Sequence, residues 1–331
     1  MFLLAAIAGI LIVSAIVQWA LTVLDSRRLC APGTFVNGLH VYQLGTGTPA
    51  IIFDSGLGAS CLSWSIVQPQ IAASTATYSY DRAGFGWSSP RRRNPCLLER
   101  RADDLHGLLQ TLNVPQPYIL VAHSFGAYIV SFHAHHHPGE IAGIVLVDPL
   151  TPEEWVNPTA EQRWRLRRVA FFNRLAGVLA FFGVARLGLW LLLRRRNESP
   201  GPLSRYIETL RRIRSEVRKF PPEVVPFIRA HWSRPGFYWA MSANVRDLAA
   251  CAAMVAHCPI PAHLPVTVLS GAQQPPERLA EQAALANASQ HGRHIICAKS
   301  AHYMHLDEPQ LITAAVQEMI ERTLGQIAAG K

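Results

Sequence analysis

The sequence has few cysteines, and they form no pattern that would hold a metal or a set of disulfides. The six are Cys30, Cys61, Cys96, Cys251, Cys258 and Cys297, with no CxxC pair and no regular spacing. This excludes a cysteine-based zinc site and a disulfide-stapled fold. Aromatic–basic repeats and known nucleic-acid motifs are also missing, so we expect no nucleic-acid partner. Half of the residues are apolar, which excludes a disordered chain.

Charged side chains are missing from the first 24 residues. Only Ser14, Gln18 and Thr22 interrupt this apolar stretch with polar groups. As a helix it would reach about 36 Å, enough for a hydrocarbon core of about 30 Å. A cleavable signal peptide would need a basic start and a shorter apolar core of roughly 7–15 residues. We therefore expect residues 1–24 to form an uncleaved membrane anchor.

Positive charge is unevenly distributed and favours a membrane as partner. Residues 151–256 contain 18 Arg and Lys but only 8 Asp and Glu, a net charge of +10, so the whole excess of the chain lies there. An anionic membrane surface fits this excess. Arg27 and Arg28 follow the anchor directly, and the positive-inside rule then predicts that the main domain lies on the cytoplasmic side.

Strand and helix patterns alternate after the anchor. Continuous apolar strands are predicted at Ala50–Phe53, Thr75–Tyr80, Tyr118–Ala122, Ile144–Val147, Val266–Leu269 and His294–Cys297. The helices expected around them are Trp64–Ile71, Leu97–Leu112, one ending near His136, and Gln310–Ile327, and Phe35–Tyr42 reads as a hairpin with an Asn-Gly turn. Unbroken apolar strands between helices are typical of an α/β protein, with a mostly parallel sheet covered on both faces.

The pattern changes in the middle of the chain to helices rich in Arg, Trp, Phe and Leu. We interpret residues 151–256 as a helical cap inserted into a sheet domain made of residues 32–150 and 257–327. The cap contains a second apolar stretch, Val169–Leu193, which Asn173, Arg174 and Arg186 interrupt. We expect cap helices that line a pocket or lie on the membrane here, rather than a second span. The runs Arg194–Arg196 and Arg211–Arg214 face either phospholipid head groups or solvent.

One short motif lies where a predicted strand meets a predicted helix. The apolar run Tyr118–Ala122 is followed by His123, Ser124, Phe125 and Gly126. Small residues on both sides of a serine suit a strained turn between a strand and a helix. Alone, the motif is weak, since the serine could also merely cap the helix.

Two further motifs appear in the expected order before it, Gly56-Leu57-Gly58 and Asp81–Ser88. With these the chain resembles the α/β-hydrolase fold superfamily over roughly residues 32–323, in particular serine hydrolases of the bacterial esterase and lipase type. The resemblance implies a nucleophile elbow of the form Gly-x-Ser-x-Gly, in which this chain has Ala122 at the first position. It also implies that Ser124 is the nucleophile and that Asp81–Ser88 is a structural turn beside the site.

A serine nucleophile needs a base, because a hydroxyl at its own pKa attacks poorly. The superfamily places its base in the loop after the last strand, where this chain has Ser300–Pro309. By motif His302 is that base, and His305, one helical turn further, is the alternative.

The acid that orients the base departs from the common pattern. Many members carry an aspartate after the strand assigned to Val266–Leu269, but Ser270–Glu277 contains none. Asp148 at the end of the preceding strand is our first candidate and Glu277 the alternative, while a dyad without an acid stays open. Asp148 precedes a proline and could also simply end its strand. The order Ser124, Asp148, His302 is the one expected for this fold.

The backbone supplies the predicted oxyanion hole. By motif its N–H donors are those of Phe125, directly after the nucleophile, and Leu57. Gly56 and Gly58 would let the backbone close around an anion. Ser55 stands where many relatives have histidine.

No metal or cofactor is expected. His133, His135, His136 and His137 cluster before Pro138, but they stand at a helix end, where histidines suit the helix dipole, and no acid or cysteine cluster joins them in sequence.

The resemblance implies a membrane-anchored hydrolase that cleaves an apolar acyl or lipid ester through an acyl-enzyme. A non-catalytic, membrane-anchored binding protein of the same fold is the alternative, since the usual acid position is empty. A lyase or acyltransferase with the same triad is a third.

Overall fold

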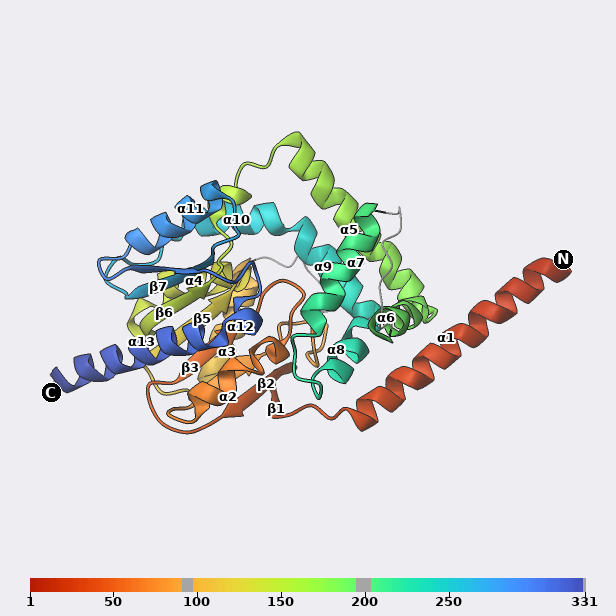
Figure 1. The fold of residues 1–331 in the computed structure, drawn as a ribbon. Coiled ribbons are helices and arrows are strands. Elements are labelled where there is room, and N and C mark those ends of the chain that lie inside the picture. The colour runs from red at the N-terminus through yellow and green to blue at the C-terminus, as the bar shows by residue number, and fades with distance from the viewer. Residues whose placement is uncertain (91–97, 195–203, 330–331) are drawn as a thin grey trace.

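The computed structural model describes residues 1–90, 98–194 and 204–329, without the side chains of 204–210. Eight strands form one sheet in the order β1-β2-β4-β3-β5-β6-β7-β8 (Figure 1). They are β1 Thr34–Val36, β2 Leu39–Leu44, β3 Ile51–Asp54, β4 Thr77–Tyr80, β5 Tyr118–His123, β6 Ile141–Val147, β7 Val266–Gly271 and β8 Arg293–Cys297. Leu97, Cys96, Arg195 and Arg196, which entered the predictions above, lie outside the described residues.

The sheet is mostly parallel, as predicted. Antiparallel pairing is confined to β2, which pairs with β1 on one side and with β4 on the other. From β4 through β8 every pairing is parallel. Asn37 and Gly38 turn the β1–β2 hairpin with φ of 52° and 81°, which is the backbone that an Asn-Gly turn adopts.

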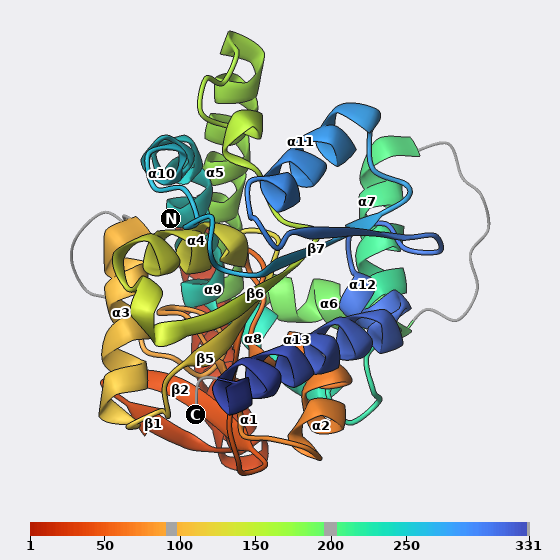
Figure 2. The ribbon, with the colours of Figure 1, turned by 90° about the vertical axis from the view of Figure 1, so that its left-hand side faces the viewer.

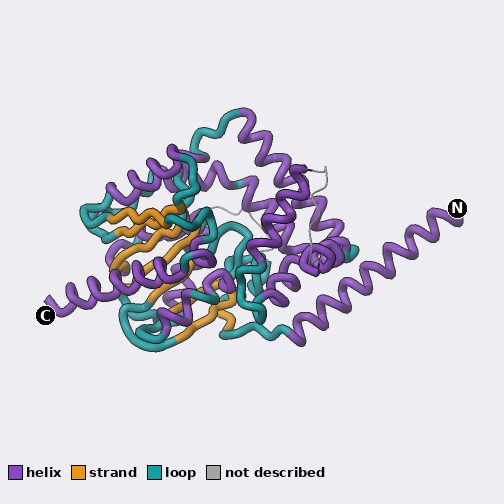
Figure 3. The backbone as a smooth tube through the Cα atoms, in the orientation of Figure 1, coloured by secondary structure: helices purple, strands orange, loops and turns teal. Residues whose placement is uncertain are grey.

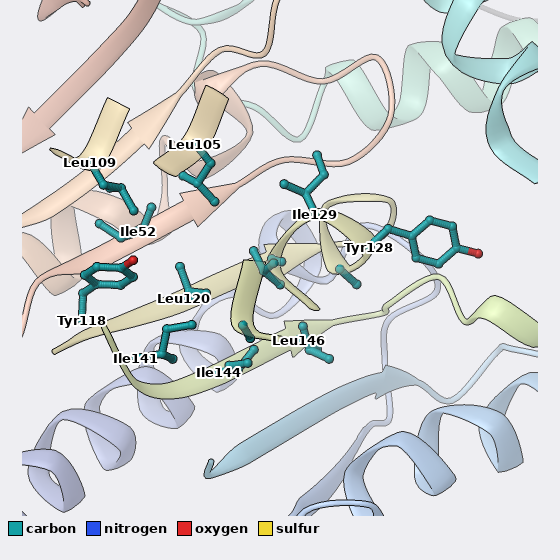
Figure 4. Packing of buried hydrophobic residues seen from close by; sticks show 14 of the residues in the cluster. Ile52, Leu105, Leu109, Tyr118, Leu120, Tyr128, Ile129, Ile141, Ile144 and Leu146 are labelled. Atoms are coloured by element: carbon teal, nitrogen blue, oxygen red, sulfur yellow. The ribbon is translucent and has the colours of Figure 1, made fainter. Parts of the chain in front are cut away.

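Helices cover both faces of the sheet (Figure 2). One face carries α3 Leu98–Thr111, α4 Gly126–His136 and α10 Leu248–Ala256, and the other carries α2 Val67–Ala72 and α13 Pro309–Ala329. Successive side chains of a strand point to opposite faces, so Leu120 of β5 packs toward α3 and α4, while Ile119 packs toward α2 and α13. Figure 4 shows Leu120 in the first of these two cores, between its register partners Ile52 of β3 and Ile144 of β6.

The 3₁₀ turns Cys61–Trp64 and Pro152–Glu154 and the short helix α12 Met304–Asp307 come after the carboxyl ends of β3, β6 and β8. The 3₁₀ turn Pro138–Glu140 precedes β6, and the helix α11 Pro276–Asn287 packs on β7 and β8. The predicted helix Trp64–Ile71 is therefore a 3₁₀ turn followed by α2.

The segment of the chain between β6 and α10 forms a helical cap beside the sheet (Figure 3). It consists of α5 Ala160–Phe181, α6 Val184–Arg194, α7 Ser204–Val217, α8 Val225–Trp232 and α9 Pro235–Arg246. Thr159 caps α5, since its hydroxyl accepts from the N–H of Gln162, whose side chain accepts in turn from the N–H of Thr159. Helix α10 falls within the range we assigned to the cap, yet its Leu248 and Val255 pack on the sheet. We keep the division into anchor, core and cap as a proposal, with its inner boundary near Asp247.

The N-terminal stretch is the helix α1 Phe2–Arg28, which leaves the body of the molecule (Figure 1). Among the described residues it is the one unbroken helix long and apolar enough to cross a membrane, as an anchor or a signal sequence would be. Helices α5 and α6 pass the same test only together, across a bend of 95°.

Candidate active site

Ser124 stands on a strained turn between β5 and α4. Its φ is 52°, a left-handed conformation that costs a residue with a Cβ about 1–3 kcal/mol. Gly126 has to be glycine, because a Cβ there would lie 2.9 Å from the carbonyl oxygen of Asp54. Ala122 is fully buried within β5 and fits in place of the usual glycine. This is the geometry of a nucleophile elbow, which exposes a serine hydroxyl at the edge of the sheet.

Asp148 follows β6 and contacts the imidazole of His302. Its carboxylate is completely buried and accepts from His302 Nδ1 at 2.5 Å. The side-chain amides of Gln274 and Gln282 also donate to it, at 2.6 and 3.0 Å, and the Arg278 guanidinium lies 3.6 Å away. Three hydrogen-bond donors and a nearby guanidinium thus surround a carboxylate that has no access to water.

The backbone holds Asp148 beside the elbow. The N–H of Ser124 donates to the carbonyl of Val147 at 3.1 Å, and the N–H of Leu150 donates to the carbonyl of Ser124 at 3.1 Å. Residues on both sides of Asp148 are thus hydrogen-bonded to Ser124. The φ of Asp148 is 42°, so this residue too occupies a left-handed turn.

Ser124 and His302 line the same cavity, whose volume is about 250 Å³. Helices α7, α8 and α9 of the cap contribute most of its apolar wall, with Ile213, Val217, Ile228, Trp232 and Phe237. Arg212, Glu216 and His231 add polar groups to the same wall. The cavity is therefore enclosed between the sheet edge and the cap, and it suits a substrate that is largely apolar.

The loop after β3 forms another side of the cavity. Gly56, Leu57 and Gly58 all line it. Within the described residues, the N–H groups of Leu57 and Phe125 donate to no protein acceptor, which leaves both available for an anion. Gly56 leaves room for the elbow, because a Cβ there would lie 2.7 Å from His123 Nδ1.

Arg82, from the Asp81–Ser88 motif, supports this loop. Its guanidinium donates to the carbonyls of Ser55 and Gly56 and pairs with the carboxylate of Asp54. Burial raises the pKa of the Asp54 carboxyl, and Arg82 opposes that rise. The motif is thus a structural turn beside the site, and its arginine fixes the loop that carries the Leu57 N–H.

Neither of the two alternative residues is placed like Asp148 or His302. Glu277 is exposed in the first turn of α11, and its neighbour Arg278, not Glu277, reaches Asp148. His305 is buried and also lines the cavity, but its ring packs 5.4 Å from that of Trp64, whereas His302 is the histidine bonded to Asp148. Burial lowers the pKa of His305 to about 3, so this imidazole stays neutral at neutral pH.

His123 is a site residue that the sequence did not single out. Its ring lies 4.7 Å from His302 and 4.5 Å from His305, and its Nε2–H donates to the carbonyl oxygen of His302 at 2.9 Å. Burial lowers its pKa well below the ordinary value. A histidine next to Ser124 in sequence thus holds the backbone of His302. Its position directly before Ser124 in the motif was the signal in the sequence that could have identified it.

Two groups outside the cavity bring potential metal ligands together among the described residues. His106, His133 and His137 form one group, and the Glu140 carboxylate lies 3.6 Å from His106 and 4.0 Å from His137. We expected no acid beside these histidines; Glu140 follows His137 by three residues, and α3 brings His106 next to both. The second group joins His40, Cys61 and Asp81.

The second group has a structural role. The Asp81 carboxylate accepts from His40 Nδ1 at 2.9 Å and from the N–H of Cys61 at 2.7 Å. It also accepts from the N–H of Trp87 at 3.0 Å, so it ties β2 to two loops.

Comparison with known proteins agrees with this architecture. The model of the alpha/beta hydrolase fold family matches residues 49–309. The uncharacterized protein YqjL of Bacillus subtilis is 32% identical over 108 residues, which are 33% of this chain and 42% of that protein. The chain spans less than half the length of the first curated relatives it matches.

Solved structures share the fold at low sequence identity. A thermophilic esterase from Thermogutta terrifontis has a TM-score of 0.58 and 21% identity, over 88% of this chain and 97% of that one. A laboratory-evolved variant of potato epoxide hydrolase has a TM-score of 0.69 and 18% identity, over 87% and 98%. At such identities the likeness concerns the fold alone. The sheet order, the elbow and the family match together show that the chain belongs to the alpha/beta hydrolase fold family.

Proposed function

We propose that this protein is a membrane-anchored serine hydrolase that cleaves an apolar carboxylic ester, an acyl or lipid ester, through an acyl-enzyme. Ser124 is the nucleophile, His302 the base and then the acid, and Asp148 the group that orients His302. The contact that carries this proposal is the 2.5 Å hydrogen bond between His302 and buried Asp148, in a cavity that His302 shares with Ser124.

In the first half of the reaction Ser124 Oγ attacks the ester carbonyl and passes its proton to His302 Nε2. The Nδ1–H of His302 already donates to Asp148, which leaves Nε2 as the basic nitrogen. The N–H groups of Leu57 and Phe125 stabilise the charge on the carbonyl oxygen. The C–O bond then breaks, and His302 returns the proton to the departing alcohol.

In the second half water hydrolyses the acyl-enzyme. His302 takes a proton from the water, the resulting hydroxide attacks the acyl carbonyl, and Ser124 leaves with the proton from His302. No step requires a metal or a cofactor.

The chemical nature of the elbow residue supports an ester as substrate. Epoxide hydrolases and haloalkane dehalogenases resemble this fold but attack with an aspartate, whereas this chain has Ser124 at that position. The apolar wall from α7, α8 and α9 favours an apolar acyl chain over a polar one.

The proposal includes the location of the enzyme. Helix α1 anchors it in a membrane, and Arg27 and Arg28 after the anchor favour a main domain on the cytoplasmic side.

A screen of p-nitrophenyl esters of graded acyl length tests the function. We expect hydrolysis that rises with chain length until the cavity is filled and that disappears in Ser124→Ala. Ser74→Ala is the matched control, because the Ser74 hydroxyl bonds only to the carbonyl of Ile71 in its own turn. A folded protein that hydrolyses none of these esters would favour the alternative of a non-catalytic binding protein.

A further inference from the structure

Helix α1 is fastened to the cap by polar contacts. Gln18 is its one buried residue; the side-chain amide donates to the carbonyl of Ser233 at 2.9 Å and accepts from Arg186 Nε at 2.8 Å. Arg186 also pairs with Asp25 at 2.6 Å. The Arg186 guanidinium of the cap thus donates to three side chains of α1, those of Gln18, Thr22 and Asp25. Removal of α1 would leave the half-buried Arg186 guanidinium and the Ser233 carbonyl without these partners.

Helix α5 has its small residues inside and its large apolar residues outside. Ala170, Gly177 and Ala180 are its buried residues. Gly177 faces α9 so closely that a Cβ there would lie 2.3 Å from the indole nitrogen of Trp239. The exposed side of the helix carries large apolar side chains, namely Val169, Phe171, Phe172, Leu175, Val178, Leu179 and Phe181. A contiguous apolar face of this kind on the surface marks a site of interaction.

Helix α6 continues that face around a corner. It turns by 95° from α5 at Phe182 and Gly183, where Gly183 adopts a φ of 78°. Val184, Leu187, Trp190 and Leu191 are exposed along it. We call α5 and α6 together the cap platform. Its two arms cannot cross a bilayer as one straight span.

The cap platform lies across α1 rather than alongside it. In Figure 1 α1 runs within the plane of the view, with α5 crossing its direction and α6 seen nearly along its axis, and Figure 2 shows α6 from the side. When α1 follows the membrane normal, both arms of the platform are therefore roughly parallel to the membrane surface. An apolar groove of about 780 Å³ separates α1 from α6, lined by residues such as Ile10, Val13 and Trp190.

The charges around the platform suit an anionic lipid surface. Between Ala160 and Arg194 the chain has seven arginines and one glutamate. Arg168 lies over the ring of Trp164 at 4.2 Å and Arg194 over that of Trp190 at 4.7 Å. Tryptophan and arginine are characteristic of the boundary between acyl chains and head groups.

We propose that the cap platform lies in the head-group boundary of the bilayer that α1 spans, and that a lipid acyl chain fills the groove between α1 and α6. The polar contacts of Gln18, Asp25 and Arg186 fix the angle between anchor and platform. The cap that walls the active-site cavity is then itself seated on the membrane. This arrangement is independent of the hydrolase activity, and Ser124→Ala would show it unchanged.

Photo-crosslinking from the lipid phase tests the proposal. The full chain is reconstituted in phosphatidylcholine–phosphatidylglycerol vesicles that contain a lipid with a diazirine in its acyl chain, irradiated, digested and mapped by mass spectrometry. We expect lipid adducts on peptides of α1, α5 and α6 and none on peptides of α11. Adducts on α1 alone, on none of these helices, or equally on α11 would overturn the proposal.

Two substitutions on the exposed side of α5 test which face of this helix contacts the lipid. Leu175 and Val178 are 43% and 49% exposed, so Leu175→Glu with Val178→Glu leaves the packing on α9 intact. In this variant we expect the yield of lipid adducts on α5 peptides to fall at least about fivefold, while the yield on α1 peptides stays the same. Ala280→Glu with Ala284→Glu on the exposed face of α11 is the matched control and should change neither. Unchanged α5 adducts in the Leu175 and Val178 variant would contradict the proposed orientation.

Discussion

Strand β5 and helix α5 bury their side chains in opposite ways. Every residue of β5 is buried, including its large Ile119 and Leu120. In α5 the buried residues are alanines and a glycine, while Phe171 is 63% exposed. The strand gains its stability from large apolar area removed from water, whereas the helix gains close contact with α9 and leaves its apolar area outside.

In our proposal this contrast separates two functions in one chain. The sheet provides rigid positions for Ser124, Asp148 and His302 at the ends of β5, β6 and the loop after β8. The cap provides an apolar wall on its inner side and, in our proposal, a membrane contact on its outer side. The active-site cavity is the place where the two regions meet.

The largest expected effect lies at the sheet edge, in His302→Ala. Loss of the base should lower kcat by about 10³–10⁴-fold, since both proton transfers depend on it. Steady-state hydrolysis of a p-nitrophenyl ester measures this. His305→Asn is the comparison. We expect its kcat to stay within about tenfold of the wild type, because His305 packs against His123, whereas the hydrogen bond to Asp148 comes from His302. An equal loss of kcat in both variants would contradict the assignment of His302 as the base.

The acid gives the next effect. Asp148→Asn should lower kcat by about 10²–10⁴-fold with little change in KM, because an amide no longer stabilises protonated His302. Glu277→Gln, on the exposed start of α11, should stay within about twofold. Full activity in Asp148→Asn together with loss in Glu277→Gln would show that our acid is the wrong one.

Core and cap should also differ in stability. Leu120→Ala removes a fully buried side chain from the sheet and should lower the free energy of unfolding by about 2–5 kcal/mol. Leu175→Ala on the outside of α5 should change it by no more than about 0.5 kcal/mol. Denaturant unfolding in detergent micelles measures both. A large loss in Leu175→Ala would mean that another part of the protein covers this face.

The buried His305 predicts a pH effect on stability. The pKa of His305 is about 3 in the folded protein, against about 6.5 in the unfolded chain. Above pH 6.5 the imidazole is neutral in both states. As the pH falls from about 6.5 toward 3, the unfolded chain binds the proton first, so the free energy of unfolding decreases.

His305→Asn should make that decrease shallower in a series of denaturant titrations between pH 7 and pH 4. Substitution of the exposed His257 by Asn should leave the slope of the wild-type protein unchanged. An identical slope in His305→Asn and the wild type would contradict the neutral, buried state of His305.

Much of the sheet and its motifs could be predicted from the sequence. Continuous apolar runs indicated the parallel strands, and Asn37-Gly38 indicated the first hairpin. The elbow was visible because its strand, its small residues and its helix are contiguous. Asp148 could be proposed because it ends a strand that follows the elbow.

What could not be predicted are contacts between segments without a shared pattern. Gln274 and Gln282 reach Asp148 across more than a hundred residues of chain, and nothing in their neighbourhood marks them. The contact of His123 with the backbone of His302 is of the same kind. The sequence also did not mark where the cap ends, since α10 follows α9 after one residue but packs on the sheet.

The central claim is that Ser124 is a nucleophile activated by its surroundings, and a fluorophosphonate probe tests it most directly. The probe reacts covalently with an activated serine, and peptide mapping by mass spectrometry identifies the residue that carries it. We expect a single adduct on Ser124, absent from Ser124→Ala. A folded protein that carries no adduct, or carries it on another serine, would contradict the account.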